Sequence, residues 1–152
     1  MSASEQTDRP ALILTRVFAA PRPLVFRAWI EPERAALWWG PQGFEILSCH
    51  MDVRPGGSWR MSLRGPSGAI QIKQGVYREI VPPERLVFTW RWLDPAGVPA
   101  HETIVTISFE EQSSGTKLTL HQAVFETAEI RDGHYAGWSG CMDRFAEYLA
   151  IL

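Results

Sequence analysis

The alternation of apolar and polar residues between positions 44 and 125 predicts a series of β-strands. Leu86, Phe88, Trp90 and Trp92 occupy every second position of one segment, so their side chains share one face of a strand. Short turns rich in Gly, Pro, Ser and Asp separate the segments, and connections of this length join antiparallel neighbours. The six predicted strands are 44–53, 58–64, 69–80, 86–93, 102–110 and 117–125.

One further strand and two short helices are predicted before this series. Residues 11–19 are rich in apolar and β-branched types and end before a proline, which favours a first strand. Pro21 and Pro23 suit the first turn of a helix, where a missing N–H costs nothing. Pro32 begins the second helix, and Gly40 ends it.

The last part of the chain predicts one long amphipathic helix. Its apolar residues recur every three or four positions and form one stripe: Trp138, Met142, Phe145, Leu149 and Leu152. A seven-stranded antiparallel sheet has one face to bury, and this helix is available to cover it. We therefore predict an α+β fold in which the sheet curls around the C-terminal helix. It forms a single domain of residues 11–152 after a flexible polar tail of residues 1–10.

This order of elements resembles the helix-grip fold of START-like proteins, the superfamily of the birch pollen allergen. Short motifs carry a closer resemblance: VFRAW at 25–29, WWGP at 38–41, DVRPGG at 52–57, GVY at 75–77, PPERLVFTW at 82–90 and GW at 137–138. In this order they are similar to the family named after the activator of the ninety-kilodalton heat-shock protein ATPase, from about position 12 to 149. The resemblance implies a fold used for binding apolar or amphipathic small molecules, for cyclase- or hydrolase-type enzymes and for co-chaperones.

Composition and charge indicate which partners and which cellular location to expect. The net charge is −2 and no Lys/Arg cluster occurs, so we expect no nucleic-acid partner. No apolar run is long enough for a membrane span, and the first ten residues lack the apolar core of a secretion signal. Cys49 and Cys141 are then expected to be reduced thiols in the cytoplasm. Seven Trp and seven Phe indicate either a thickly packed core or a cavity with aromatic walls.

We interpret the aromatic residues as the wall of a cavity between the sheet and the last helix, which binds a small, mainly apolar or aromatic molecule. Gly137 and Gly140 favour this, because they remove side-chain volume from the helix while Phe145 and Leu149 fill the other end. Gln122 lies on the same strand face as Leu118 and Leu120, which is expected to point inward, and is a candidate for orienting the ligand. The candidate ligand-binding residues are Trp59, Trp90, Trp92, Thr103, Leu120, Gln122, Tyr135, Trp138 and Met142. A solid core, with Gln122 bonded to a backbone carbonyl or a buried water, is the alternative.

An enzyme of cyclase, dehydratase or hydrolase type, using the same cavity, is a second hypothesis. A general acid or base would then be a buried Asp52, Glu79, His101 or Glu102, although these residue types are usually solvated, and no catalytic residue is assigned. The four histidines have no metal-ligand spacing, so we expect neither a metal nor a cofactor.

A co-chaperone-like protein-interaction module is the third hypothesis. It needs a broad surface rather than a pocket. Trp38 and Trp39 are relevant to it, because they are adjacent at a helix end and cannot both point the same way. We expect one of them to be exposed, to cover the cavity mouth or to form a homodimer contact.

Overall fold

The computed structural model describes residues 9–152 of the chain. Within this range the elements are β1 (Leu12–Phe18), α2 (Arg22–Ile30), α3 (Pro32–Ala35), β2 (Glu45–Met51), β3 (Ser58–Arg64), β4 (Ile70–Val81), β5 (Arg85–Leu93), β6 (Thr103–Gln112), β7 (Gly115–Ala123) and α4 (Ala128–Ala150). The predicted order of elements is confirmed. The predicted tail, residues 1–10, lies almost entirely outside the described residues.

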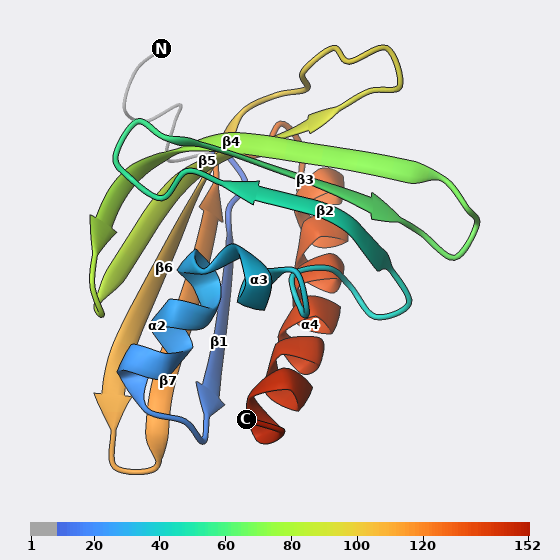
Figure 1. The fold of residues 1–152 in the computed structure, drawn as a ribbon. Helices are drawn as coiled ribbons and strands as arrows, with labels where there is room; N and C mark the ends of the chain where they lie inside the picture. The colour runs from blue at the N-terminus through green and yellow to red at the C-terminus, as the bar shows by residue number, and fades with distance from the viewer. Residues whose placement is uncertain (1–8) are drawn as a thin grey trace.

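The strands form one antiparallel sheet in the order β1-β7-β6-β5-β4-β3-β2. Register shifts interrupt the pairing between Ile46 and Ser48 and between Tyr77 and Glu79. Such irregularities bend a strand and increase its twist. The sheet is accordingly strongly curved, with β1, β6 and β7 running steeply across the direction of β2–β5 (Figure 1).

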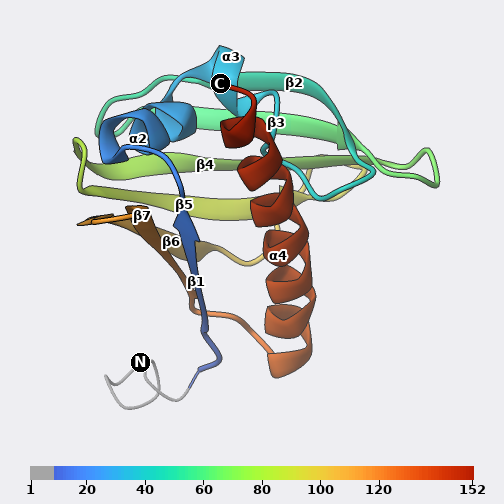
Figure 2. The same ribbon diagram turned by 90° about the horizontal axis from the view of Figure 1, so that it is seen from below.

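All three helices of the described range lie on the concave side of the sheet, with α4 passing along its open side (Figure 2). Helix α2 packs against β6 and β7, α3 against β2, and α4 against β1. Thr127 caps α4, since its side-chain oxygen accepts a hydrogen bond from the Ile130 N–H at 3.1 Å. The structure therefore confirms the helix-grip α+β fold.

Trp38 and Trp39 are both buried, with exposed fractions of 0% and 2%. The expectation that one of them is exposed was wrong. Helix α3 ends at Ala35, and the turn after it sends the two indoles to different neighbours inside the core. The ring centroid of Trp38 lies 4.2 Å from that of Phe145 on α4, and that of Trp39 lies 4.9 Å from that of Trp59 on β3.

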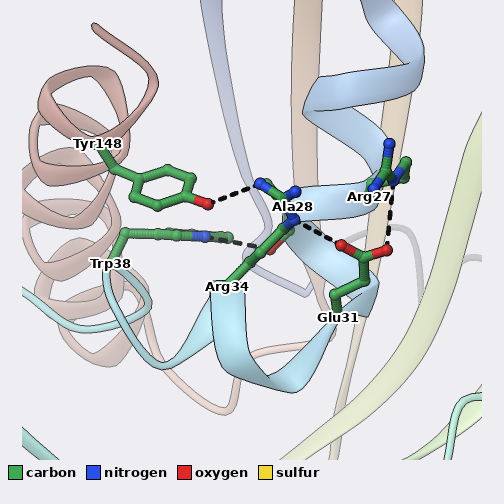
Figure 3. A network of polar contacts seen from close by, with 6 residues as sticks. All are labelled: Arg27, Ala28, Glu31, Arg34, Trp38 and Tyr148. Atoms are coloured by element: carbon green, nitrogen blue, oxygen red, sulfur yellow. Dashed lines mark hydrogen bonds and ion pairs between the residues drawn. The ribbon is translucent and has the colours of Figure 1, made fainter. Parts of the chain in front are cut away.

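A polar network fixes the C-terminal end of α4 beside the short helices (Figure 3). Arg34 donates to the Tyr148 hydroxyl at 3.1 Å and to the Glu31 carboxylate at 2.5 Å. The Trp38 indole N–H donates to the carbonyl oxygen of Ala28 at 3.1 Å. This end of the helix is therefore closed against α3, and any space beneath α4 must lie toward its N-terminal half.

Among the helices of residues 9–152, none is both long and apolar enough to cross a membrane.

Candidate functional site

A pocket of about 320 Å³ lies between the N-terminal half of α4 and strands β4 and β5. We call it the Lys73 pocket. Its lining residues from the sheet are Gln71, Lys73, Trp90 and Trp92. Those from α4 are Gly133, His134, Gly137, Trp138 and Cys141, and the loop before β2 adds Gly40 and Pro41.

Glycines on α4 leave this space open. A Cβ atom at Gly133 would meet nothing within 4 Å, and one at Gly137 would only touch the Pro41 ring at 4.0 Å. Glycine in a helix interior is destabilising by about 1 kcal/mol relative to alanine. Gly140 does not line the pocket, because it packs over the backbone of the 41–42 segment. The predicted loss of side-chain volume therefore occurs at Gly137 and one turn earlier, at Gly133.

Lys73 extends from β4 into the base of the pocket and is only 3% exposed. Its Nζ lies 4.5 Å from the ring centroid of Trp90 and 4.9 Å from that of Trp39, so two indole faces contact the cation. Among residues 9–152 no carboxylate forms an ion pair with this ammonium group. A buried cation without a counter-ion is rare, since removal from water is costly unless the charge is paired.

The groups around Lys73 are electrically neutral near pH 7. Burial lowers the pKa of His134 to about 4, so its imidazole is uncharged. Burial also raises the pKa of the Cys141 thiol to about 12 and that of the Cys49 thiol to about 11. The pKa of Lys73 itself falls from its usual 10.5 to about 8, again mainly through burial. The pocket thus holds one basic group and no anion to neutralise it.

His134 and Trp92 form one wall of the pocket. The Trp92 indole N–H donates to Nε2 of His134 at 3.2 Å, which requires the neutral imidazole with a free acceptor at this nitrogen. The same two residues and Trp90 also border a smaller pocket of about 140 Å³ beside Thr103 and Phe125. The Trp92–His134 pair therefore stands between the two pockets.

The sequence of residues 19–150 matches the family described as Activator of Hsp90 ATPase homolog 1-like protein. The chain belongs to this family. The match covers most of the chain and confirms the resemblance drawn from the short motifs.

Solved structures of several bacterial proteins share the fold. An AHSA1 protein from Silicibacter pomeroyi is 25% identical, with a TM-score of 0.85 over 93% of this chain and 99% of that chain. A protein from Chromobacterium violaceum is 30% identical, with a TM-score of 0.77 over 91% of this chain and 96% of that chain. A protein from Nitrosomonas europaea is 29% identical, with a TM-score of 0.77 over 92% of this chain and 94% of that chain. No curated protein matches the chain.

In this AHSA1-family chain, three of the predicted binding residues border the Lys73 pocket: Trp90, Trp92 and Trp138. Gln122 is fully buried behind them, and both ends of its amide are occupied. Its Nε2 donates to Thr103 Oγ1 at 2.8 Å, and its Oε1 accepts from the Trp138 indole N–H at 2.8 Å. Gln122 thus fixes the orientation of the Trp138 ring, and Thr103 borders only the smaller pocket.

The other predicted binding residues lie away from the Lys73 pocket. Leu120 and Met142 are fully buried in the core. Trp59 is buried beneath Trp39, and its indole N–H donates to the Thr89 carbonyl oxygen at 3.1 Å. Tyr135 is 43% exposed and does not border the Lys73 pocket.

The candidate acids and bases also lie elsewhere. Asp52 pairs with Arg54, Glu79 with Arg85, and Glu102 with Arg78 and Arg91. The ring Nε2 of His101 lies 2.6 Å from the Val124 carbonyl oxygen, and His101 borders only the smaller pocket. The Lys73 pocket therefore has no carboxylate among its lining residues.

Sequence reasoning missed Lys73, although one signal was present. The chain has only two lysines among 15 basic residues, and Lys73 has the same strand parity as Tyr77, which is buried. An isolated lysine on the covered face of a strand is a feature that a face-by-face analysis of β4 could have identified.

Proposed function

We propose that the protein binds a small aromatic molecule in the Lys73 pocket, with an electron-rich oxygen of the ligand against Lys73. The observation that carries this proposal is the buried ammonium without an ion-pair partner in the described chain. A carboxylate, phenolate or carbonyl oxygen placed beside Nζ would supply the missing interaction, and hydrogen bonds to charged groups are stronger than neutral ones.

The lining of the pocket supports an aromatic ligand. Trp90, Trp92 and Trp138 offer indole rings for stacked or edge-to-face contact with a ligand ring. The N–H of Trp90 is buried and has no hydrogen-bond partner within residues 9–152, so it is a further donor in this region. A volume of about 320 Å³ is near the lower end of the range for ligand pockets. This size favours a ligand with a single ring or two fused rings over a long lipid.

The interaction hypothesis has less support. An exposed tryptophan at the end of α3 would have favoured it, but Trp38 and Trp39 are both buried. We therefore favour ligand binding over a co-chaperone-like role.

The test is a titration of intrinsic tryptophan fluorescence with 2-naphthoate, 2-naphthalenemethanol, decanoate and a flavonoid. We expect saturable quenching by the aromatic compounds, with 2-naphthoate bound most tightly. The Lys73→Met variant should lose roughly ten-fold or more in affinity for 2-naphthoate, and much less for the uncharged alcohol.

Two helix variants locate the binding site. Gly137→Phe puts a ring into the pocket and should abolish quenching, whereas Ala136→Phe adds the same ring on the exposed side of the same turn and should not. Circular dichroism checks that both variants fold. If no aromatic compound quenches, or if Gly137→Phe binds as well as the wild type, the proposal is wrong.

A further inference from the structure

The base in the pocket is a lysine in a chain that otherwise uses arginine. Of 15 basic residues, 13 are Arg and two are Lys: Lys73 and Lys117. Arginine binds planar anions through two parallel hydrogen bonds and stays protonated in proteins, so it is the better residue for holding an anion alone. Lysine differs because it can lose its proton, and the neutral amine is a nucleophile.

We propose that Lys73 forms a reversible imine with the carbonyl carbon of a small aromatic aldehyde or ketone. This rests on the proposed function, because the carbonyl compound occupies the same pocket. The amine nitrogen adds to the carbonyl carbon, a C–N bond forms, and the carbonyl oxygen becomes the hydroxyl of a carbinolamine. One amine proton has moved to oxygen to make this hydroxyl, which then takes the second amine proton and leaves as water, so that a C=N bond remains. The imine nitrogen gains its positive charge by taking one proton from the solvent. The step needs no oxidant, reductant or metal.

The surroundings of Nζ suit both the free amine and its product. The protonated imine carries the positive charge of the ammonium at the same nitrogen, between the indole faces of Trp39 and Trp90 at 4.9 and 4.5 Å. The aromatic group of the carbonyl compound would then lie along the pocket, whose remaining walls include Trp92 and Trp138.

The neighbouring groups leave the amine reactive at neutral pH. The groups that face Lys73 are the Cys49 thiol from β2 and the His134 imidazole and Cys141 thiol from α4. All three are uncharged near pH 7, so no anion holds the lysine in its protonated form. With its pKa lowered to about 8, roughly a fifth of Lys73 is the free amine at pH 7.4, about two hundred times the fraction of an ordinary lysine.

The experiment traps the imine by reduction. The wild-type protein is incubated at pH 7.4 with 2-naphthaldehyde and sodium cyanoborohydride, and the adduct is located by peptide mass spectrometry. We expect Lys73 to be modified at least ten-fold faster than Lys117, although Lys117 is partly exposed and Lys73 is buried. The rate at Lys73 should level off near pH 8.

Lys73→Arg is the matched control, because it keeps the positive charge but has no amine that forms an imine. It should remove the fast adduct and leave the slow labelling of Lys117 unchanged. Unfolding the wild type in guanidinium chloride should equalise the two lysines. Slower or equal labelling of Lys73 in the folded protein overturns the proposal.

The two proposals fail separately. If 2-naphthoate binds at Lys73 but the aldehyde leaves no adduct there, the imine is wrong and the binding function stands. If 2-naphthoate and 2-naphthalenemethanol do not bind but the aldehyde labels Lys73 selectively, the imine proposal is supported. The proposal that the pocket binds these ligands non-covalently is then wrong.

Discussion

Replacing Lys73 by methionine should stabilise the protein at neutral pH. Methionine has a similar length and no charge, and the aromatic surroundings of Nζ suit its polarizable thioether. In the wild type, folding takes an ammonium group out of water and gives it no carboxylate partner in residues 9–152. An apolar residue of similar volume in place of a buried charge is often neutral or stabilising.

The magnitude follows from the pKa of Lys73. Folding lowers this pKa from 10.5 to about 8, and one pKa unit corresponds to about 1.4 kcal/mol, so the charged form destabilises the fold by about 3 kcal/mol. The unfolded chain binds the proton more tightly, so this destabilisation is complete below pH 8. It disappears as the pH rises from 8 to 10.5, and the wild type gains stability relative to the variant over that interval.

Urea unfolding of both proteins at pH 7 and pH 10 measures this difference. We expect Lys73→Met to be more stable by about 3 kcal/mol at pH 7 and by less than about 1 kcal/mol at pH 10. Burial raises the pKa values of Cys49, Tyr77 and Cys141 in both proteins, so most of their effect at high pH cancels in the comparison. The charge of Lys73 also acts on the two thiols, but this charge is largely absent from the folded protein at pH 10.

Lys117→Met is the control for this experiment. Lys117 is partly exposed and its Nζ lies 3.9 Å from the Glu110 carboxylate, so its loss should change stability by no more than about 0.5 kcal/mol at either pH. A stability difference between Lys73→Met and the wild type that does not depend on pH would refute the reasoning, because Lys73 would then carry no buried charge.

Two further substitutions test the supports of the site. Gln122→Leu leaves the Trp138 N–H without its acceptor, removes the hydrogen bond that Thr103 Oγ1 accepts, and should destabilise the fold by about 2–3 kcal/mol, measured by urea unfolding; an effect below about 0.5 kcal/mol would mean that the amide is not part of a buried network. Thr127→Ala removes the cap of α4 and should cost about 1 kcal/mol, measured as a lower melting temperature; an unchanged melting temperature would show that the cap contributes nothing.

The order of elements was predictable because it depends on local signals. Turn residues mark the ends of each strand, and antiparallel pairing follows from short connections. For strand β4, the sequence pattern did not show which face is buried. Its apolar Ile70 and Val76 are exposed, whereas Lys73 and Tyr77 on the other face are buried. Alternation gives two faces, but only the position of α4 decides which face is covered.

The interior contacts of the site required the three-dimensional structure. Gln122 was predicted to face inward, and it does, but its partners come from β6 and α4, whose registers a single sequence does not fix. The two adjacent tryptophans were misjudged for a related reason. Helix α3 is one turn long, so helical spacing does not apply to Trp38 and Trp39. The cytoplasmic location and the homodimer stay predictions.

The nitrogen atom Nζ of Lys73 determines both the expected change in stability and the proposed function. A buried charge with an expected cost of about 3 kcal/mol is difficult to explain by packing alone. Natural proteins commonly retain destabilising groups where function needs them. If Lys73→Met is more stable than the wild type in the expected pH-dependent way and also loses 2-naphthoate binding, then the same lysine lowers the stability of the fold and binds the ligand. If the variant gains stability and still binds 2-naphthoate as well as the wild type does, the charge of Lys73 is not needed for binding.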